Sequence, residues 1–232
     1  MKLSRTMIAL VLFSVAFAYV EAAVVVYLRI HYDPIRADAY PQHPDGDLFP
    51  MLRLEHLQQA GPQYTHMLWI ELGRELATLV MLAAMGLAIA RNVREWLAAF
   101  MIAFGVWDIF FYVFLKLLID WPPSLMTWDI LFLLPVPWVG PVISPLLVAV
   151  SIIAAGMVIL RRESRGRPIR FGGFHWMAIL GGGIFVVIAF CWDFSNTAAG
   201  GWPNPFNWPL FALGEAVGLA GFLHAYWIGQ KR

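Results

Sequence analysis

The chain has 232 residues, of which 60% are hydrophobic and 13% are charged, and its formal net charge is +1. About a quarter of the residues in a soluble domain are charged, so this composition carries more apolar surface than a soluble core could bury and indicates an integral membrane protein. The near-zero charge gives no indication of a nucleic-acid partner, which requires a concentrated basic face, and the single cysteine, Cys191, excludes internal disulfides and cysteine-cluster metal sites.

Six apolar segments each approach the length of about 20 residues that a hydrocarbon core requires. The first follows Lys2 and Arg5 and contains the small-residue run 16–18, which is typical of a signal-peptide cleavage site. Its apolar stretch continues to Leu28, so we expect a retained first helix. The sequence therefore predicts an all-α integral membrane protein, a single polytopic domain over residues 1–232 with a bundle of about six transmembrane helices, near 6–29, 64–90, 96–118, 141–160, 173–193 and 208–228.

The distribution of basic residues predicts the orientation of the bundle. If the N-terminus is cytoplasmic, the inner segments hold 11 of the 16 basic residues and only two acids, Glu95 and Glu163. These inner segments are 1–5, 91–95, 161–172 and 229–232. Because short loops rich in Lys and Arg stay on the cytoplasmic side, we expect a multi-pass protein of a bacterial-type inner membrane with both termini in the cytoplasm.

Two of the predicted outer loops have unusual compositions. The long loop 30–63 has turn residues at 41–47, followed by a segment from Pro50 to Ala60 that is expected to form a short helix on the outer interface. The loop 121–138 is apolar but its apolar part is too short to span, so we expect it to be re-entrant or interfacial. A re-entrant backbone needs protection by protein, because hydrocarbon offers it no hydrogen bonds.

Six Asp, Glu and Arg side chains fall well inside the predicted spans, on four different helices. A charge in the hydrocarbon costs about 2.5–3.5 kcal/mol on insertion scales, so such residues normally face the bundle interior and pair. At 1.5 Å per residue, all of them lie about 10–17 Å below the outer surface. We therefore expect one polar site in the outer half of the membrane, formed by Glu21, Glu71, Arg74, Glu75, Asp108 and Glu215.

Helical spacing refines this site. Glu71, Arg74 and Glu75 share one face of their helix. Asp108 and Tyr112 form an i, i+4 pair, and Lys116 continues that row toward the outer surface. The predicted ligand-binding residues are Glu21, Glu71, Arg74, Glu75, Asp108, Tyr112 and Glu215. Among them, Glu71, Glu75 and Asp108 are the candidates for acid–base catalysis.

Several functions fit a cluster of one arginine and five acids. One hypothesis is a structural ion-pair network, in which Arg74 clamps helices within a non-catalytic subunit or scaffold of a larger complex. A second is that the excess carboxylates handle protons, a cation or a small ligand, as in a transporter, although the chain has no recognisable inverted repeat. A third is an intramembrane enzyme that acts on a lipid-like substrate. The expected partners are membrane lipid, a second copy of the chain or a membrane complex.

The remaining histidines and glycines give weaker indications. Four loop histidines match no metal motif, so no metal site is predicted and no cofactor is identified: His31, His43, His56 and His66. His175 and His224 lie near the inner ends of two spans, where a pair could hold haem, but an interfacial position is the simpler interpretation. Gly181–Gly183 and the Gly214, Gly218 pair are expected to form helix-packing surfaces.

Overall fold

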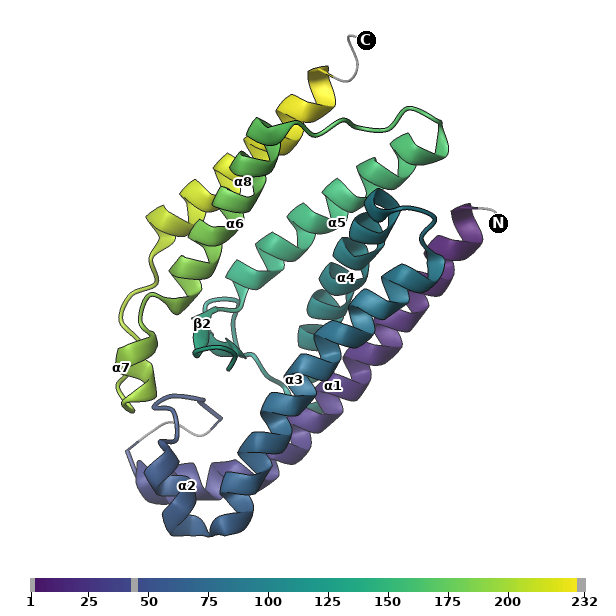
Figure 1. Cartoon of the computed structure of the whole chain (residues 1–232). Helices are drawn as coiled ribbons and strands as arrows, with labels where there is room; N and C mark the ends of the chain where they lie inside the picture. The colour runs from purple at the N-terminus through teal and green to yellow at the C-terminus, as the bar shows by residue number, and fades with distance from the viewer. Residues whose placement is uncertain (1–2, 43–45, 229–232) are drawn as a thin grey trace.

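The computed structural model describes residues 3–42 and 46–228 and confirms the all-α membrane fold. Within these ranges, six helices are long and apolar enough to cross a membrane. They are α1 (Leu3–Ala39), α3 (Pro62–Ile89), α4 (Val93–Ile119), α5 (Ile143–Ser164), α6 (Gly173–Cys191) and α8 (Trp208–Ile228). Two short helices, α2 (Leu54–Ala60) and α7 (Phe194–Ala198), lie at one end of the bundle (Figure 1), which we call the α2 end. The first residue of α1 and the last of α8 both lie at the opposite end, the terminal end.

The first helix extends ten residues beyond the predicted end at residue 29, because α1 continues to Ala39. An ion pair between Arg36 and Asp33 at 2.6 Å supports the added turns. The predicted outer loop 30–63 is therefore helical in its first third, and its short helix begins at Leu54 rather than near Pro50. The central residues 43–45 of its predicted turn, His43 included, lie outside the described ranges, as do Lys2, Lys231 and Arg232 of the basic segments.

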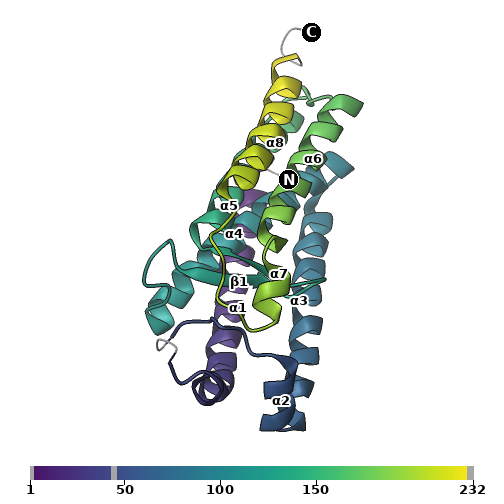
Figure 2. The same cartoon turned by 90° about the vertical axis from the view of Figure 1, so that its left-hand side faces the viewer.

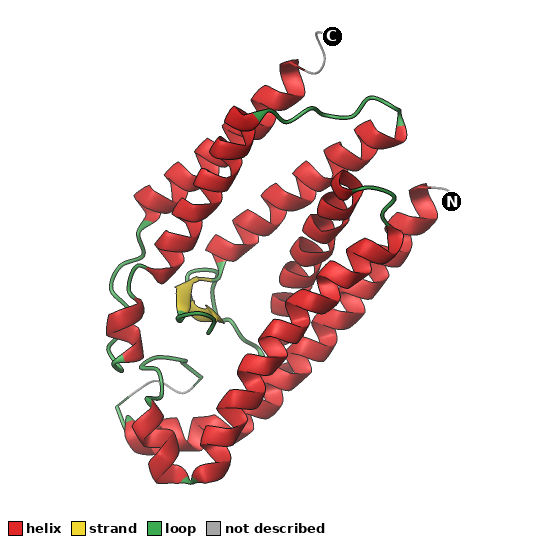
Figure 3. Cartoon of the chain, in the orientation of Figure 1, coloured by secondary structure: helices red, strands yellow, loops and turns green. Residues whose placement is uncertain are grey.

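The apolar loop 121–138 contains strand β1 (Trp128–Phe132), which pairs antiparallel with β2 (Trp138–Pro141). The register places Asp129 opposite Gly140, and the ladder is irregular between Ile130 and Phe132. Figure 3 shows this hairpin between the helices. Pairing within the hairpin provides the backbone hydrogen bonds that a segment among membrane helices requires.

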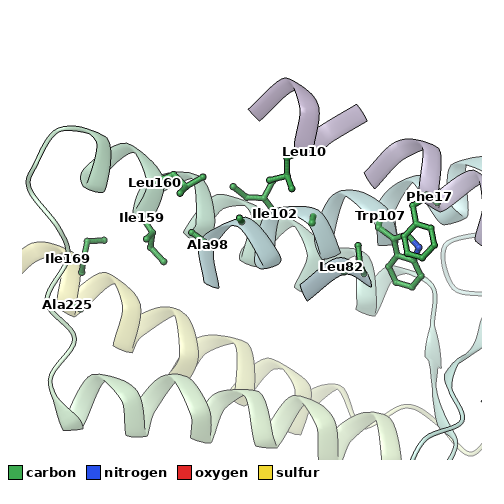
Figure 4. Packing of buried hydrophobic residues seen from close by; sticks show 13 residues of the cluster. Leu10, Phe17, Leu82, Ala98, Ile102, Trp107, Ile159, Leu160, Ile169 and Ala225 are labelled. Atoms are coloured by element: carbon green, nitrogen blue, oxygen red, sulfur yellow. The ribbon is translucent and has the colours of Figure 1, made fainter. Parts of the chain in front are cut away.

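Helices α1, α3, α4 and α5 form one layer of the bundle, with α4 in contact with the other three. Leu10, Leu82 and Ile102 are fully buried at their contacts (Figure 4). Glycines bring α4 and α5 close, since a Cβ atom on Gly105 would lie 2.8 Å from the carbonyl oxygen of Ala149. This layer is the part of the molecule that carries most of the predicted site residues.

Helices α6 and α8 form a separate pair that packs through glycine (Figure 2). A Cβ atom on Gly182 would lie 2.5 Å from the carbonyl oxygen of Gly214 and 2.6 Å from the nitrogen of Gly218. The predicted glycine packing surface is confirmed at Gly182 and Gly214, because only a residue without a side chain permits backbones to approach so closely, whereas a Cβ atom on Gly218 would meet no atom closer than 4.0 Å. Gly181 and Gly183 face open space instead.

Candidate functional site

A cavity of about 620 Å³ lies between the α1–α3–α4–α5 layer and the α6–α8 pair. Side chains from all six long helices and from the β-hairpin line it. All seven predicted ligand-binding residues are among the lining residues: Glu21, Glu71, Arg74, Glu75, Asp108, Tyr112 and Glu215. The cavity therefore brings together side chains that the sequence could only place at similar depth, but it holds them as separate groups.

The first group is centred on Arg74 of α3. Its guanidinium forms ion pairs with Glu21 of α1 and with Glu71, whose Oε2 accepts a bond from Nε at 2.8 Å. The Thr78 hydroxyl donates to Glu21 at 2.7 Å. Glu21 is only 4% exposed, so its charge is compensated inside the bundle by a cation and a hydroxyl. This group ties α1 to α3.

Glu75 forms a second group with the β-hairpin. Both of its carboxylate oxygens lie 3.0 Å from the backbone nitrogen of Leu133, which donates to them. Phe132, the neighbouring residue, stacks on Phe104 of α4. The Glu75 carboxylate thus satisfies the backbone N–H of Leu133 at the tip of the hairpin. This contact holds the tip of the hairpin against α3.

The third group joins Asp108 and Tyr112 of α4 to Asp129 of β1. The Tyr112 hydroxyl donates to Asp129 Oδ2 at 2.7 Å, and the Ile130 nitrogen donates to Oδ1 at 2.8 Å. Burial raises the pKa of the Asp129 carboxyl to about 6, although these hydrogen bonds oppose the shift. Oδ2 of Asp108 is buried and has no hydrogen-bond partner among the described residues. An unsatisfied carboxylate oxygen facing a cavity is available to a bound molecule.

Glu215 does not join these groups through any direct bond. It accepts a hydrogen bond at 2.7 Å from Ser151 of α5, and this bond links α8 to the first layer. Lys116, which continued the Asp108 row, also stays apart, because it pairs with Asp120 at 2.6 Å near the end of α4. The single polar site expected from the sequence is therefore divided, with Glu215 on the opposite wall of the cavity.

The cavity has further polar residues that the sequence analysis missed. Three of them come from α1. Arg29 lies at the predicted end of the first span, and Tyr32 and Arg36 lie in the segment that was predicted to be loop. Their i, i+3, i+7 spacing continues the helical pattern of Glu21 and Val25, and this periodicity was the available signal. Asp129 was a lone acid in an apolar loop, and only the strand register brings it to Tyr112.

Polarity changes along the cavity. Charged and hydroxyl-bearing residues line the α2 end and the middle. Toward the terminal end the lining becomes apolar, with Ile152, Ala155, Ile159, Ile179, Leu219 and Phe222 from α5, α6 and α8. On α5 alone the lining extends from Pro145 to Ile159, about 21 Å at 1.5 Å per residue. The cavity is long, with a polar end and an apolar end.

The two membrane histidines meet each other rather than the cavity. Nε2 of His175 lies 3.1 Å from Nδ1 of His224, at the terminal end of α6 and α8. Among the residues that the structure describes, no three His, Cys, Asp or Glu side chains are grouped closely enough to hold a metal ion. The histidine pair therefore links two helices at their ends.

Comparisons with known proteins add no family to this description. No family model, no curated protein and no solved structure matches the chain.

Proposed function

We propose that this membrane protein binds an amphiphilic, lipid-like molecule in its central cavity. The observation that carries the proposal is the polarity of one continuous cavity, with ion pairs and free polar atoms toward the α2 end and apolar side chains toward the terminal end. Its volume of about 620 Å³ falls within the range of about 300–1,000 Å³ for small-molecule sites. An elongated apolar space beside a polar site matches a molecule with a chain and a headgroup.

The other hypotheses account for less of this geometry. A proton or cation relay needs ionisable groups toward both ends, whereas the lining residues toward the terminal end are apolar in the described chain. A purely structural ion-pair network explains the contacts of Arg74 but gives no reason for a cavity beside it, since helix interiors normally close-pack. Binding of an amphiphile uses both the charges and the volume.

A matched pair of substitutions on α8 tests the proposal. Leu219 lines the apolar part of the cavity, and Leu213 lies on the same helix, is 49% exposed and does not line it. The Leu219→Trp variant fills the cavity, so it should lose co-purified lipid and bind an added diacylglycerol at least tenfold more weakly. The Leu213→Trp variant should behave as the wild type. Native mass spectrometry from detergent measures both quantities.

Two results would contradict the proposal. Binding that is equal in wild type, Leu219→Trp and Leu213→Trp would mean that lipid contacts only the outer surface. A wild-type protein that binds no amphiphile would leave the cavity without this role. Thermal unfolding of both variants serves as the control for folding.

One observation favours a catalytic role as a second candidate. The free Oδ2 of Asp108 is a buried acceptor that lines the cavity, which is the position a general base needs beside a bound substrate. If Asp108 acts on the bound molecule, the Asp108→Asn variant should fold and retain a different chemical species from the wild type. Identical bound species in both proteins would limit the function to binding.

A further inference from the structure

We propose that Arg29, Tyr32 and Arg36 form a binding site for a phosphate group at the α2 end of the cavity, so that the amphiphile bound there is a phosphate-bearing one. This inference rests on the proposed function and names the chemical class of its ligand. Because α1 continues to Ala39, these three residues share one face and all line the cavity.

Each of the three side chains has buried donor atoms without a partner. They are Nε and Nη2 of Arg29, the hydroxyl of Tyr32 and Nε of Arg36. The Arg36 side chain is only 7% exposed, so water does not readily satisfy its donor. A buried donor without an acceptor costs about 1–3 kcal/mol, and more when it is charged. Unsatisfied donors on three positions of one helix face indicate that a ligand supplies the acceptor oxygens.

The charges of this group favour an anion. Arg29 forms no ion pair with any described carboxylate, and its guanidinium instead lies 4.5 Å from the centre of the Trp121 ring. Its one hydrogen bond within the described ranges, from Nη1 to the Gly46 carbonyl oxygen, is long at 3.4 Å. Arg36 uses Nη1 to pair with Asp33 and keeps Nε free. Asp33, Asp47 and Asp129 lie close enough to interact electrostatically with Arg29 but form no direct ion pair with it, so its free donors stay open to an anion.

A phosphate group fits these donors better than a neutral headgroup. Guanidinium groups bind phosphate oxygens through charge-assisted, often paired hydrogen bonds, and a tyrosine hydroxyl adds one more donor. The nearby acids already have partners, since Asp33 pairs with Arg36, Asp129 accepts from Tyr112 and Asp47 accepts from the Phe49 nitrogen at 3.3 Å. Arg29 lies eight residues, about 12 Å, from Glu21 along α1, so a headgroup here leaves the rest of the cavity for the remainder of the molecule.

The test compares two lipids with the same acyl chains, phosphatidic acid and diacylglycerol, titrated into the purified full chain and followed by native mass spectrometry. The wild type should prefer phosphatidic acid at least tenfold. Arg29→Gln and Arg36→Gln should reduce this preference below threefold and leave diacylglycerol binding intact. Arg29→Lys keeps the charge but has fewer directed donors, so its preference for phosphatidic acid should lie between that of the wild type and that of Arg29→Gln.

A control variant removes a positive charge from the same end of the molecule. Arg53 is 43% exposed, pairs with Glu55 and does not line the cavity, so Arg53→Gln should keep the full preference. If Arg53→Gln loses the preference as well, surface electrostatics explains it and the phosphate site is wrong. An equal affinity of the wild type for both lipids would overturn the phosphate site while amphiphile binding stands.

Inorganic phosphate distinguishes the possible sources of the group. If it competes with phosphatidic acid in the wild type, the three residues recognise the phosphate group itself. If it binds in an Arg29-dependent way and neither lipid binds, the anion site stands and the proposed amphiphile function fails. Binding of neither lipid and no effect of inorganic phosphate would overturn both proposals.

Discussion

The two parts of the bundle are held together by different interactions. In the α1–α3–α4 part, charged side chains join helices to one another and to the hairpin, as Arg74 does with Glu21 and Glu75 with Leu133. In the α6–α8 pair, backbone packs on backbone at Gly182 and Gly214, and Glu215 is the one ionisable residue that the pair contributes to the cavity. The first part presents fixed polar groups, whereas the second provides a thin apolar wall.

This difference explains why a cavity lies between the two parts. The α6–α8 pair reaches the first layer mainly through β2 and through the bond between Ser151 and Glu215. Side chains of the pair that face the interval, such as Ile179, Leu219 and Phe222, line the cavity without closing it. The contrast can be tested by disrupting each part separately.

The largest effect is expected in the charged part. Replacing Arg74 by Gln removes the cation from Glu21 and Glu71 and leaves two buried carboxylates without their partner. Breaking a buried pair in this way typically costs about 3–5 kcal/mol. Thermal unfolding in detergent should show a large loss of stability, and the double variant Arg74→Gln with Glu21→Gln should recover part of it. An unchanged unfolding temperature for Arg74→Gln would mean that the network does not hold α1 to α3.

A slightly smaller effect is expected in the glycine-packed part. In Gly182→Val the new Cβ would meet the carbonyl oxygen of Gly214, so the helices must separate at a cost of about 3 kcal/mol. Gly181→Val is the matched control, because no atom lies within 4 Å of a Cβ at that position. Unfolding temperatures of the two variants measure the difference. Equal destabilisation by both would show that helix propensity, rather than contact between α6 and α8, limits this position.

The smallest effect concerns Asp129, which lies in the hairpin between the two parts. Its pKa is about 6 in the folded protein and 3.8 without the fold, so between these values the folded state binds more protons than the unfolded state. Stability must therefore fall as pH rises through this window, by about 2 kcal/mol between pH 4 and pH 6 for this group. In unfolding measurements at different pH values, the free energy of unfolding of the wild type should fall over this range by that amount more than that of the Asp129→Asn variant. Parallel curves for the two proteins would contradict the buried position of the carboxylate.

The sequence alone determined the membrane fold and the types of residue in the site. Hydropathy identified six spans, and the cost of charge in hydrocarbon marked Glu21, Glu71, Arg74 and Asp108 as interior residues, which line the cavity. The glycines at 182 and 214 also indicated a helix-packing surface, because only glycine allows two helix backbones to approach so closely. These properties depend on each segment separately, so they can be read without knowing its neighbours.

Tertiary structure alone decided how these residues are grouped. The rotation of α8 places Glu215 where it accepts a hydrogen bond from Ser151 and not from Arg74. The strand register places Asp129 where it accepts a hydrogen bond from Tyr112. The continuation of α1 placed Tyr32 and Arg36 in the cavity instead of in a loop. Hydrophobicity restricts a helix to the bilayer but does not fix its rotation or its partners, because those follow from packing between segments far apart in the chain.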